Sequence, residues 1–265
     1  MLDSTPLLNE TWARVSAVRC SGHTAPGHSR SGRTAPEEPV TAPAVVLVRR
    51  GVFVRTVDGR PAAADVTTGY VALPGQSQRI THPRGGDVCT SIRIPPEMAD
   101  RFAHAGPLRV TTPADLLHRH LLTAHPADRA TLTSDLLAAL IPPGEARPPR
   151  PEIEEIRTLL HTVPASTLTE LATHVGWSPW YLSRQFHHAT GCTLSTYRRR
   201  LRVRAALDAL TDPSADLATV ATNAGFADQP HMTRAIHHET GQTPAAHRRQ
   251  STPASGVDHY LLRRK

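Results

Sequence analysis

Polar side chains with hydrogen-bonding and ionic chemistry recur at equivalent positions of two short helical patterns in the second half of the sequence. The outward positions of the first pattern are Trp180, Ser183, Arg184 and His187. Those of the second pattern are Gln229, His231, Thr233 and Arg234. In the major groove of DNA an arginine can bind guanine through two hydrogen bonds, and a glutamine can bind adenine in the same way. The two faces are therefore candidate readers of double-stranded DNA.

Each candidate reader also has a plainer interpretation. Trp180 can pack against the turn that precedes its helix instead of facing DNA. Arg184 and Arg234 can clamp phosphates instead of reading bases, because half or more of protein–DNA hydrogen bonds go to the backbone. Their equivalent placement in two copies nevertheless favours a shared role over two stray surface arginines.

The charge pattern around the first copy favours a polyanionic partner. The chain has 30 basic and 23 acidic residues, for a net charge of +7, and Lys265 is its single lysine. No acidic residue occurs between Glu170 and Asp208, yet this segment contains Arg184, Arg198, Arg199, Arg200, Arg202 and Arg204. A solvated surface normally mixes charges of both signs. Nucleic-acid contact explains the segment better, and Arg198 and Arg199 join the candidate DNA contacts.

These side chains belong to an internal repeat. Residues 171–177 (LATHVGW) correspond to residues 220–226 (VATNAGF), and residues 182–191 correspond to residues 232–241. In each copy a short helical pattern ends at a glycine followed by an aromatic residue, and a longer pattern starts three or four positions later. This spacing is typical of a helix-turn-helix.

The residues at the turns support this interpretation. Gly176 can adopt the positive φ of a sharp helix exit, Ser178 can cap the next helix, and Pro179 suits its first turn. In the second copy Asp228 can cap the helix, and Pro230 lies in the first turn, where a missing N–H costs little. The apolar positions expected to face inward are Leu182, Phe186, Met232 and Ile236.

A continuous helical pattern over residues 194–210 joins the two copies and would span about 25 Å. A strut of this length predicts that the second helices of the two copies enter successive major grooves on one face of a duplex, roughly 34 Å apart. We expect Tyr197, Leu201 and Leu207 on the buried side of the strut and its arginines in solvent.

The first half of the chain has the shorter period of β-strands. Strand patterns occupy residues 44–48, 52–57, 69–73, 78–80 and 88–94, and a weak alternation over 12–20 allows one more. The pair Asp58-Gly59 predicts a hairpin turn, and two amphipathic helices are expected between residues 113 and 141. The predicted fold class is α+β, with an N-terminal antiparallel β-barrel, two following helices, and a C-terminal all-α domain of two helix-turn-helix units joined by a linker helix.

Prolines mark the expected domain boundary. Five prolines fall within residues 142–151, which predicts a stiff linker between a sensor or dimerisation domain over 1–141 and a DNA-binding domain over 152–250. A flexible basic tail is expected over 251–265, and residues 21–43 indicate a loop. No secretion signal or membrane-length apolar run is found, so we expect a cytoplasmic protein without a membrane partner.

The second half resembles the DNA-binding domain of the AraC/XylS family of bacterial transcription regulators, from Pro151 to Arg249. The first copy carries L-A-x-x-V-G-W-S-P-x-Y-L-S-R-x-F-x-x-x-T-G, the linker carries R-x-x-x-A-x-x-x-L from Arg202, and the second copy carries A-G-F-x-D over 224–228 and T-G-x-T-P over 240–244. The resemblance implies a sequence-specific DNA-binding regulator whose second helices enter the major groove, with RNA polymerase as a further partner.

The second copy departs from the family pattern. Pro230 stands where serine is usual, and Met232 and Ile236 stand where aromatic residues are usual, so this copy is expected to pack less firmly or to read DNA more weakly. The pairs His187-His188 and His237-His238 follow the inward positions, where the family often has lysine or arginine. Because histidine gains charge below about pH 6.5, we hypothesise that DNA affinity rises on mild acidification.

The first half resembles the cupin-type sensor domain that many of these regulators carry. The resemblance lies in Arg50-Gly51, residues 57–59, residues 69–74 and His82. It implies a domain that binds a small-molecule effector or forms a homodimer, with the helices over 113–140 in part of the contact.

Several kinds of chemistry have no motif in the sequence. Nucleophile-elbow, zinc-protease, phosphate-loop and dinucleotide signatures are absent, and His82 lacks the nearby histidines and glutamate of a metal-binding cupin, so we expect no catalytic residue, no metal and no cofactor. Cys89 is expected to be core material rather than a redox sensor. Two alternatives stay open. A cupin-like enzyme fused to a DNA-binding tail would contain a metal centre, and a non-specific nucleic-acid-binding protein would not discriminate against random duplex.

Overall fold

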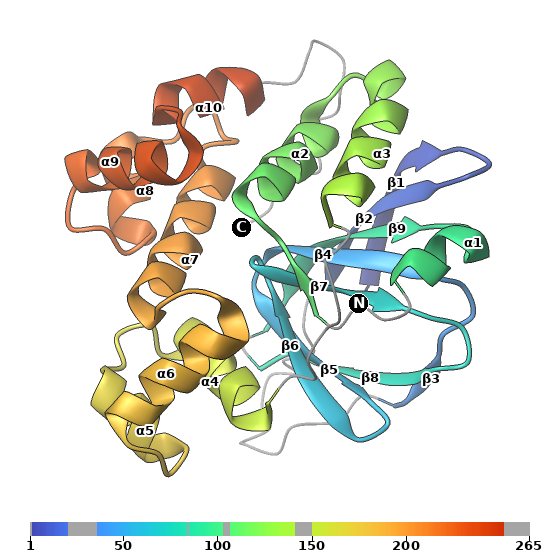
Figure 1. The fold of residues 1–265 in the computed structure, drawn as a ribbon. Coiled ribbons are helices and arrows are strands. Elements are labelled where there is room, and N and C mark those ends of the chain that lie inside the picture. Colours follow the sequence, from blue (N-terminus) through green and yellow to red (C-terminus); the bar gives the residue numbers. More distant parts are fainter. Residues whose placement is uncertain (1, 21–35, 84, 103–106, 141–149, 252–265) are drawn as a thin grey trace, which may run out of the picture. The chain divides into compact units, whose positions relative to one another are not determined.

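The structure, a computed structural model, describes five segments of the chain: residues 2–20, 36–83, 85–102, 107–140 and 150–251 (Figure 1). They have the predicted α+β architecture, with a curled antiparallel sheet in the first half and helices in the second. Most of the predicted loop, linker and tail lies outside the described residues, and Pro151, the last residue of the predicted linker, is the first residue of a helix.

The chain divides into two units. The first holds the described residues within 1–109 and 141–198, which are the sheet and the first helix-turn-helix copy. The second holds those within 110–140 and 199–265, which are two helices of the first half and the second copy. Each helix-turn-helix thus shares a unit with a different part of the N-terminal half.

The sheet is antiparallel and curled into a half-barrel. Its strands are β1 Leu2–Asn9, β2 Arg14–Cys20, β3 Glu38–Pro39, β4 Ala44–Arg50, β5 Val52–Val57, β6 Arg60–Asp65, β7 Thr68–Ala72, β8 Ser77–Thr81, β9 Asp87–Arg93 and β10 Leu108–Arg109. They pair in the order β1-β2-β9-β4-β7-β6-β5-β8-β3, and β10 pairs with β7. Within the described residues no pairing joins β1 to β3.

The predicted hairpin turn is confirmed. Asp58 and Gly59 connect β5 to β6 with φ values of 50° and 73°, as a two-residue turn with two positive φ angles requires. Strands β1, β3, β6 and β10 were not predicted. The alanine-rich sequence of β6 lacks the β-branched residues typical of strands, and β1 contains Pro6, beside which its register with β2 shifts.

Valine-rich strands supply the packed interior of the sheet. One buried cluster consists of Val46, Val48, Phe53, Ala64 and Cys89. Gly69 in β7 allows the close approach of β4, because a Cβ at this position would lie 2.4 Å from the carbonyl oxygen of Val46. A side chain there would force two paired strands apart.

The first unit also contains helices in addition to the sheet. They are α1 Pro96–Ala99, the 3₁₀ turn Asp100–Phe102, α4 Pro151–Thr162, α5 Leu168–His174, α6 Pro179–Thr190 and the first part of α7 Leu194–Ala209. Helix α4 buries Ile153, Ile156 and Leu160, each at most 2% exposed, and packs on β5 and β6.

The second unit is helical. It comprises α2 Thr112–Thr123, the 3₁₀ turn Pro126–Asp128, α3 Arg129–Leu140, the rest of α7, α8 Leu217–Asn223, α9 Gln229–Thr240 and α10 Pro244–Ser251. Helices α2 and α3 confirm the two helices predicted after the sheet. Among the described residues, no helix has the length and apolar character needed to cross a membrane.

Candidate nucleic-acid interface

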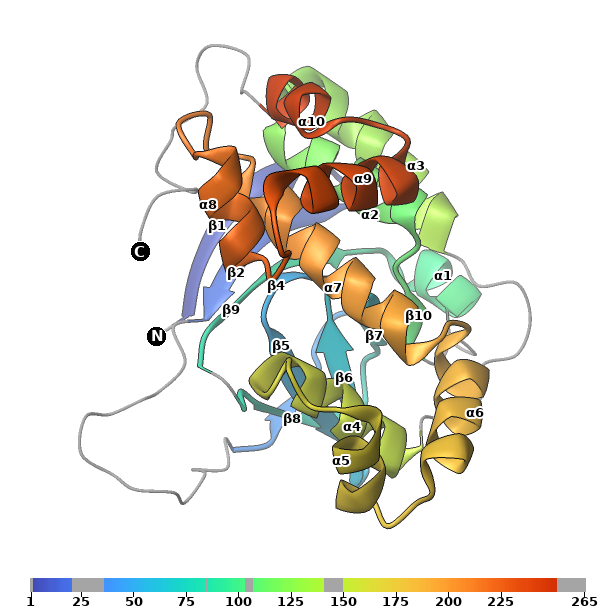
Figure 2. The ribbon, with the colours of Figure 1, turned by 90° about the vertical axis from the view of Figure 1, so that its left-hand side faces the viewer.

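Helices α5 and α6 pack together as the first helix-turn-helix (Figure 2). Gly176 adopts a φ of 70° at the exit from α5. The Oγ of Ser178 accepts a hydrogen bond from the backbone N–H of Tyr181 at 3.2 Å and so caps α6, which ends at Gly191 with a φ of 72°. The predicted turn, cap and terminator of the first copy are confirmed.

The two sides of α6 differ in burial as predicted. Leu182 and Phe186 are each 0% exposed. The exposed positions include all four candidate readers, Trp180, Ser183, Arg184 and His187. Their arrangement makes an open polar face on α6, whose contact with DNA stays a prediction.

Trp180 does not pack against the preceding turn. Its side chain is 68% exposed, and the guanidinium carbon of Arg184 lies 5.5 Å from the centre of its ring. At the turn, Trp177 and Tyr181 pack against each other instead, with ring centres 5.0 Å apart in an edge-to-face arrangement. The plainer interpretation of Trp180 is therefore wrong, and its indole forms part of the outward face.

Helices α8 and α9 form the second helix-turn-helix. The carboxylate of Asp228 caps α9 by accepting the N–H of His231 at 2.6 Å, and Pro230 lies in the first turn as predicted. Met232 and Ile236 are both 0% exposed, so the replacement of aromatic residues leaves these positions fully buried. They belong to a core contributed by α7, α8, α9 and the turns beside them: Val203, Ala206, Leu207, Leu210, Val220, Ala221, Phe226 and Ala235.

The outward side of α9 carries the second set of candidate readers. Gln229, His231 and Arg234 are exposed, whereas Thr233 is half-buried. The imidazole of His231 packs edge-to-face on Phe226, with ring centres 5.3 Å apart. This contact fixes the orientation of one candidate reader at the start of α9.

The arginines of α7 do not form the expected solvated stripe. Arg204 is buried and donates to the backbone carbonyl of Val110 at 2.7 Å. Arg200 lies 2.8 Å from the carboxylate of Glu239 in α9, and Arg199 lies 4.0 Å from it. Arg198 donates to the carbonyl oxygen of Ser166. Burial of Tyr197 and Leu207 is confirmed. These four arginines, however, bind other groups of the protein.

The most extensive polar network of the first unit was not predicted. Asp65, at the end of β6, is 0% exposed and lies 3.2 Å from Nη2 of Arg157 in α4. Nε of Arg157 donates to the hydroxyl of Tyr197 at 2.9 Å, and that hydroxyl donates to Asp65. The carboxylate of Glu154 accepts the backbone N–H of Ala63 and a hydrogen bond from Arg157, each at 2.7 Å. The network ties β6 to both α4 and α7.

Electrostatics hold the buried carboxylate of this network in its charged form. Burial alone would raise the pKa of Asp65, but the positive charge of Arg157 and the hydrogen bond from His161 lower it well below its usual value. Burial also favours the neutral form of Tyr197 and raises its pKa. The charge of Asp65 therefore depends mainly on Arg157, and removing either side chain leaves the other buried without its strongest opposite charge.

The second unit contains a buried network of ion pairs as well. Asp115 in α2 is 4% exposed, lies 2.9 Å from Nε of Arg119 and lies 3.6 Å from Nε of Arg204 in α7. Burial would raise the pKa of Asp115, but the two arginines lower it. As in the first unit, a carboxylate of the N-terminal half is bound to a helix that flanks a helix-turn-helix.

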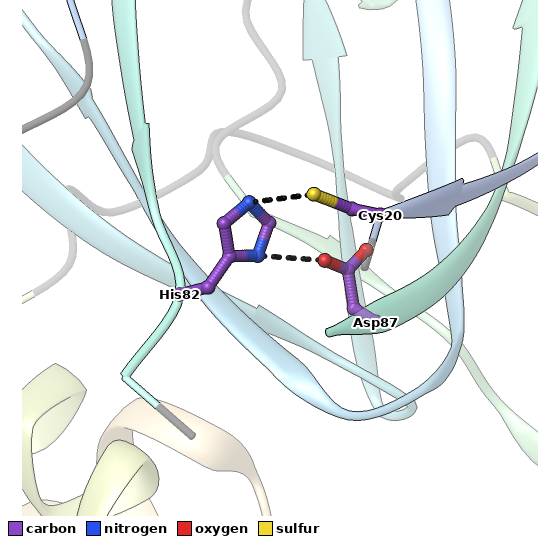
Figure 3. A group of neighbouring side chains, drawn as sticks. All are labelled: Cys20, His82 and Asp87. Atoms are coloured by element: carbon purple, nitrogen blue, oxygen red, sulfur yellow. Dashed lines mark hydrogen bonds and ion pairs between the residues drawn. The ribbon is translucent and has the colours of Figure 1, made fainter. Parts of the chain in front are cut away.

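The structure brings Cys20 beside His82, although the two residues are 62 positions apart in the sequence. Cys20, His82 and Asp87 meet on the sheet of the first unit (Figure 3). His82 lacks the nearby histidines and glutamate of a metal-binding cupin, and its neighbours here are a cysteine from β2 and an aspartate from β9. The core role predicted for Cys89 agrees with its 9% exposure, and burial followed by the charge of Asp87 raises the pKa of its thiol.

Comparison with known proteins identifies a helix-turn-helix domain at residues 171–250. The chain is 33% identical over 82 residues to the Probable transcription factor PqrA of Proteus vulgaris, a match that covers 31% of this chain and 67% of PqrA. It is 37% identical over 122 residues to the HTH-type transcriptional regulator RipA of Corynebacterium diphtheriae, a match that covers 44% of this chain and 36% of RipA.

Among solved structures, a transcriptional regulator with an AraC-type DNA-binding domain from Chromobacterium violaceum is 25% identical and covers 38% of this chain and 92% of that chain, with a TM-score of 0.36. A TM-score of this size adds nothing to the assignment, which rests on the sequence matches and on the paired helix-turn-helix units. The match spans two thirds of PqrA but little more than a third of RipA. The chain belongs to the AraC/XylS family of DNA-binding transcription regulators.

Proposed function

We propose that the protein regulates transcription by placing α6 and α9 in the major groove of double-stranded DNA. The exposed pair of Trp180 and Arg184 carries this proposal. A tryptophan that is 68% exposed gives up most of the stabilisation that burial would supply, and exposed large apolar side chains commonly mark binding sites when they gather with others. The neighbouring arginine and the absence of acidic residues between Glu170 and Asp208 indicate an anionic partner.

The exposed side chains receive different roles in this proposal. Arg184 and Arg234 bind base edges, because both guanidinium groups are exposed on the outward sides of their helices. Trp180 makes the apolar contact that a thymine methyl group accepts, and Gln229 binds adenine. Ser183, His187, His231 and the half-buried Thr233 add shorter contacts. Arg198 and Arg199 contact phosphates rather than bases, since each guanidinium already has a protein partner.

The N-terminal half is proposed to control this DNA binding. It would respond to a small-molecule effector or to a second copy of the chain, and the bound regulator would act on RNA polymerase in the cytoplasm. Support comes from the two buried networks, in which Asp65 contacts Arg157 and Asp115 contacts Arg204. A change at β6 or at α2 can reach one helix-turn-helix through each of them.

The proposal is tested by selecting bound duplexes from a random DNA library with the full chain. The selected duplex should compete at least about a thousandfold better than random duplex at about 0.15 M salt, because specific regulators discriminate by this much. Equal competition by both duplexes would contradict sequence-specific regulation and favour non-specific binding through arginines.

A further inference from the structure

Three side chains of different chemistry converge in the first unit. Cys20 ends β2 and is paired in register with Asp87 at the start of β9. His82 follows β8 and lies 62 residues from Cys20 along the chain. Figure 3 shows the imidazole of His82 between the thiol and the carboxylate. The short connection from β8 to β9 places His82 near Asp87, and the pairing of β2 with β9 places Cys20 there.

The distances among these side chains suit a common ligand. Sγ of Cys20 is 3.3 Å from Nε2 of His82, and Nδ1 of His82 is 2.7 Å from Oδ1 of Asp87. One sulfur, one nitrogen and one oxygen atom of the three residues all lie within 4.8 Å of one another. Around a zinc ion with bonds of about 2.0 to 2.3 Å, ligand atoms are about 3.3 to 3.6 Å apart. Because an imidazole binds an ion through one nitrogen, the His82 ring and the other two side chains would rotate to bring one atom of each residue onto one ion.

The carboxylate of Asp87 in this cluster is buried without a lysine or arginine paired to it among the described residues. The side chain of Asp87 is 2% exposed and that of His82 is 20% exposed. Among the described residues, the ion pairs of Asp87 are limited to His82. A buried carboxylate without a fixed cation is costly. A bound metal ion would supply the missing charge.

Two atoms at the centre of the cluster lack hydrogen bonds. Nδ1 of His82 and Oδ1 of Asp87 are buried and unpaired by hydrogen-bond geometry, although they are only 2.7 Å apart. Two groups in a donor–acceptor relationship normally align at such a distance. Both buried atoms therefore have hydrogen-bonding capacity that no described protein group satisfies, and it is available to a bound ion.

The same three residue types can also activate a cysteine nucleophile. The order of thiol, imidazole and carboxylate is that of a nucleophile, its base and an orienting acid. That mechanism depends on a well-formed hydrogen bond between Nδ1 of His82 and Asp87, which is the contact that fails in geometry. Alkylation of Cys20, described below, distinguishes a nucleophilic cysteine from a metal ligand.

We propose that Cys20, His82 and Asp87 form a three-ligand site for a divalent transition-metal ion of the zinc class. Thiolate, imidazole and carboxylate together select zinc or a similar ion over magnesium or calcium, which prefer oxygen ligands alone. Three protein ligands leave a fourth position for water or an exogenous ligand. The site goes beyond the DNA-reading function and does not depend on it.

The test is a titration of the metal-free, reduced full chain with Co²⁺, which reports thiolate ligation through a near-ultraviolet charge-transfer band. We expect binding of one ion per chain and displacement of Co²⁺ by Zn²⁺. Cys20→Ser should abolish the charge-transfer band, and His82→Gln and Asp87→Asn should each weaken binding by at least about tenfold. The matched control is Cys192→Ser, which removes a buried thiol at the end of α6 and should leave binding unchanged.

Circular dichroism of every variant separates lost binding from lost folding, and His82→Gln and Asp87→Asn keep the proposal testable if Cys20→Ser fails to fold. A charge-transfer band that persists in folded Cys20→Ser, or no saturable binding by the wild-type chain, would overturn the proposal. Rapid alkylation of Cys20 by iodoacetamide that excess Zn²⁺ does not slow would overturn it in favour of a nucleophile. Operator binding by metal-free protein is measured separately, so failure of this site is distinct from failure of the regulator function.

Discussion

Asp65 and Arg157 form a buried ion pair 3.2 Å long in which both side chains are at most 3% exposed. Asp65 ends a strand of the sheet, whereas Arg157 lies in the helix that precedes the first helix-turn-helix. The hydroxyl of Tyr197 bonds to both side chains, so the start of α7 takes part in the same network. The sheet of the N-terminal half and the helices on either side of the first helix-turn-helix are therefore joined by charge as well as by apolar packing.

Arg157→Met should destabilise the protein by about 3 to 5 kcal/mol, because Asp65 and Glu154 would be left buried without their cation. Urea unfolding followed by circular dichroism measures the change. The control Arg79→Met breaks an ion pair whose side chains are 35% and 54% exposed, and such pairs contribute about 0 to 1 kcal/mol. Equal losses in the two variants would contradict the structural role of the Asp65 network.

Acidification should destabilise the protein through Asp65 and Asp115. Both carboxyls have pKa values below their unfolded values in the folded chain. Their stabilisation is thus fully present above the unfolded pKa of about 3.9 and is lost as the pH falls through the lower folded pKa. Unfolding free energies measured from about pH 6 to pH 3 should fall less steeply in Asp65→Asn than in the wild type. Parallel curves would show that Asp65 has an ordinary pKa.

Ser178→Ala should cost about 1 kcal/mol of stability, because it removes the oxygen that caps α6. Ser183→Ala is the matched change on the same helix, where the side chain is exposed and outward. We expect it to leave stability within about 0.5 kcal/mol of the wild type and to weaken DNA binding. If thermal unfolding ranks the two variants in the opposite order, the assigned cap is wrong.

DNA affinity should rise when the pH is lowered from 8 to 6 at fixed salt. His187 and His237 are exposed near the ends of α6 and α9, where protonated imidazoles would attract the phosphates of a bound duplex. Fluorescence anisotropy with a selected operator measures the effect, and the double variant His187→Gln and His237→Gln should reduce it. An affinity that does not change with pH in the wild type would remove the hypothesis.

Local signals predicted the helical half well. Gly176, Ser178 and Asp228 act on backbone groups within a few positions, so their roles as turn and cap residues follow from neighbouring sequence alone. The inward positions of α6 and α9 follow from helical period in the same way. These features needed no knowledge of the rest of the fold.

Non-local contacts account for what the sequence did not predict. No residue near Arg157 in the sequence indicates that Asp65 of β6 lies beside it. The arginines of α7 were predicted to lie in solvent, whereas Glu239 binds Arg200 and the carbonyl of Val110 binds Arg204. Cys20 and His82 are 62 residues apart and meet because β2 pairs with β9, which begins shortly after His82. Strand β6 was missed because alanine carries no strong preference for a strand.

Duplex selection with Arg184→Ala and with the wild type shows whether the outward face of α6 reads bases. We expect the variant to have relaxed preference at one operator position and to lose about 1 to 3 kcal/mol in binding to the preferred duplex. Arg60→Ala, which removes an exposed arginine from the β5–β6 hairpin, should leave the selected sequence unchanged. A uniform loss of affinity over all sequences, with every base preference intact, would contradict base reading and make Arg184 a phosphate contact.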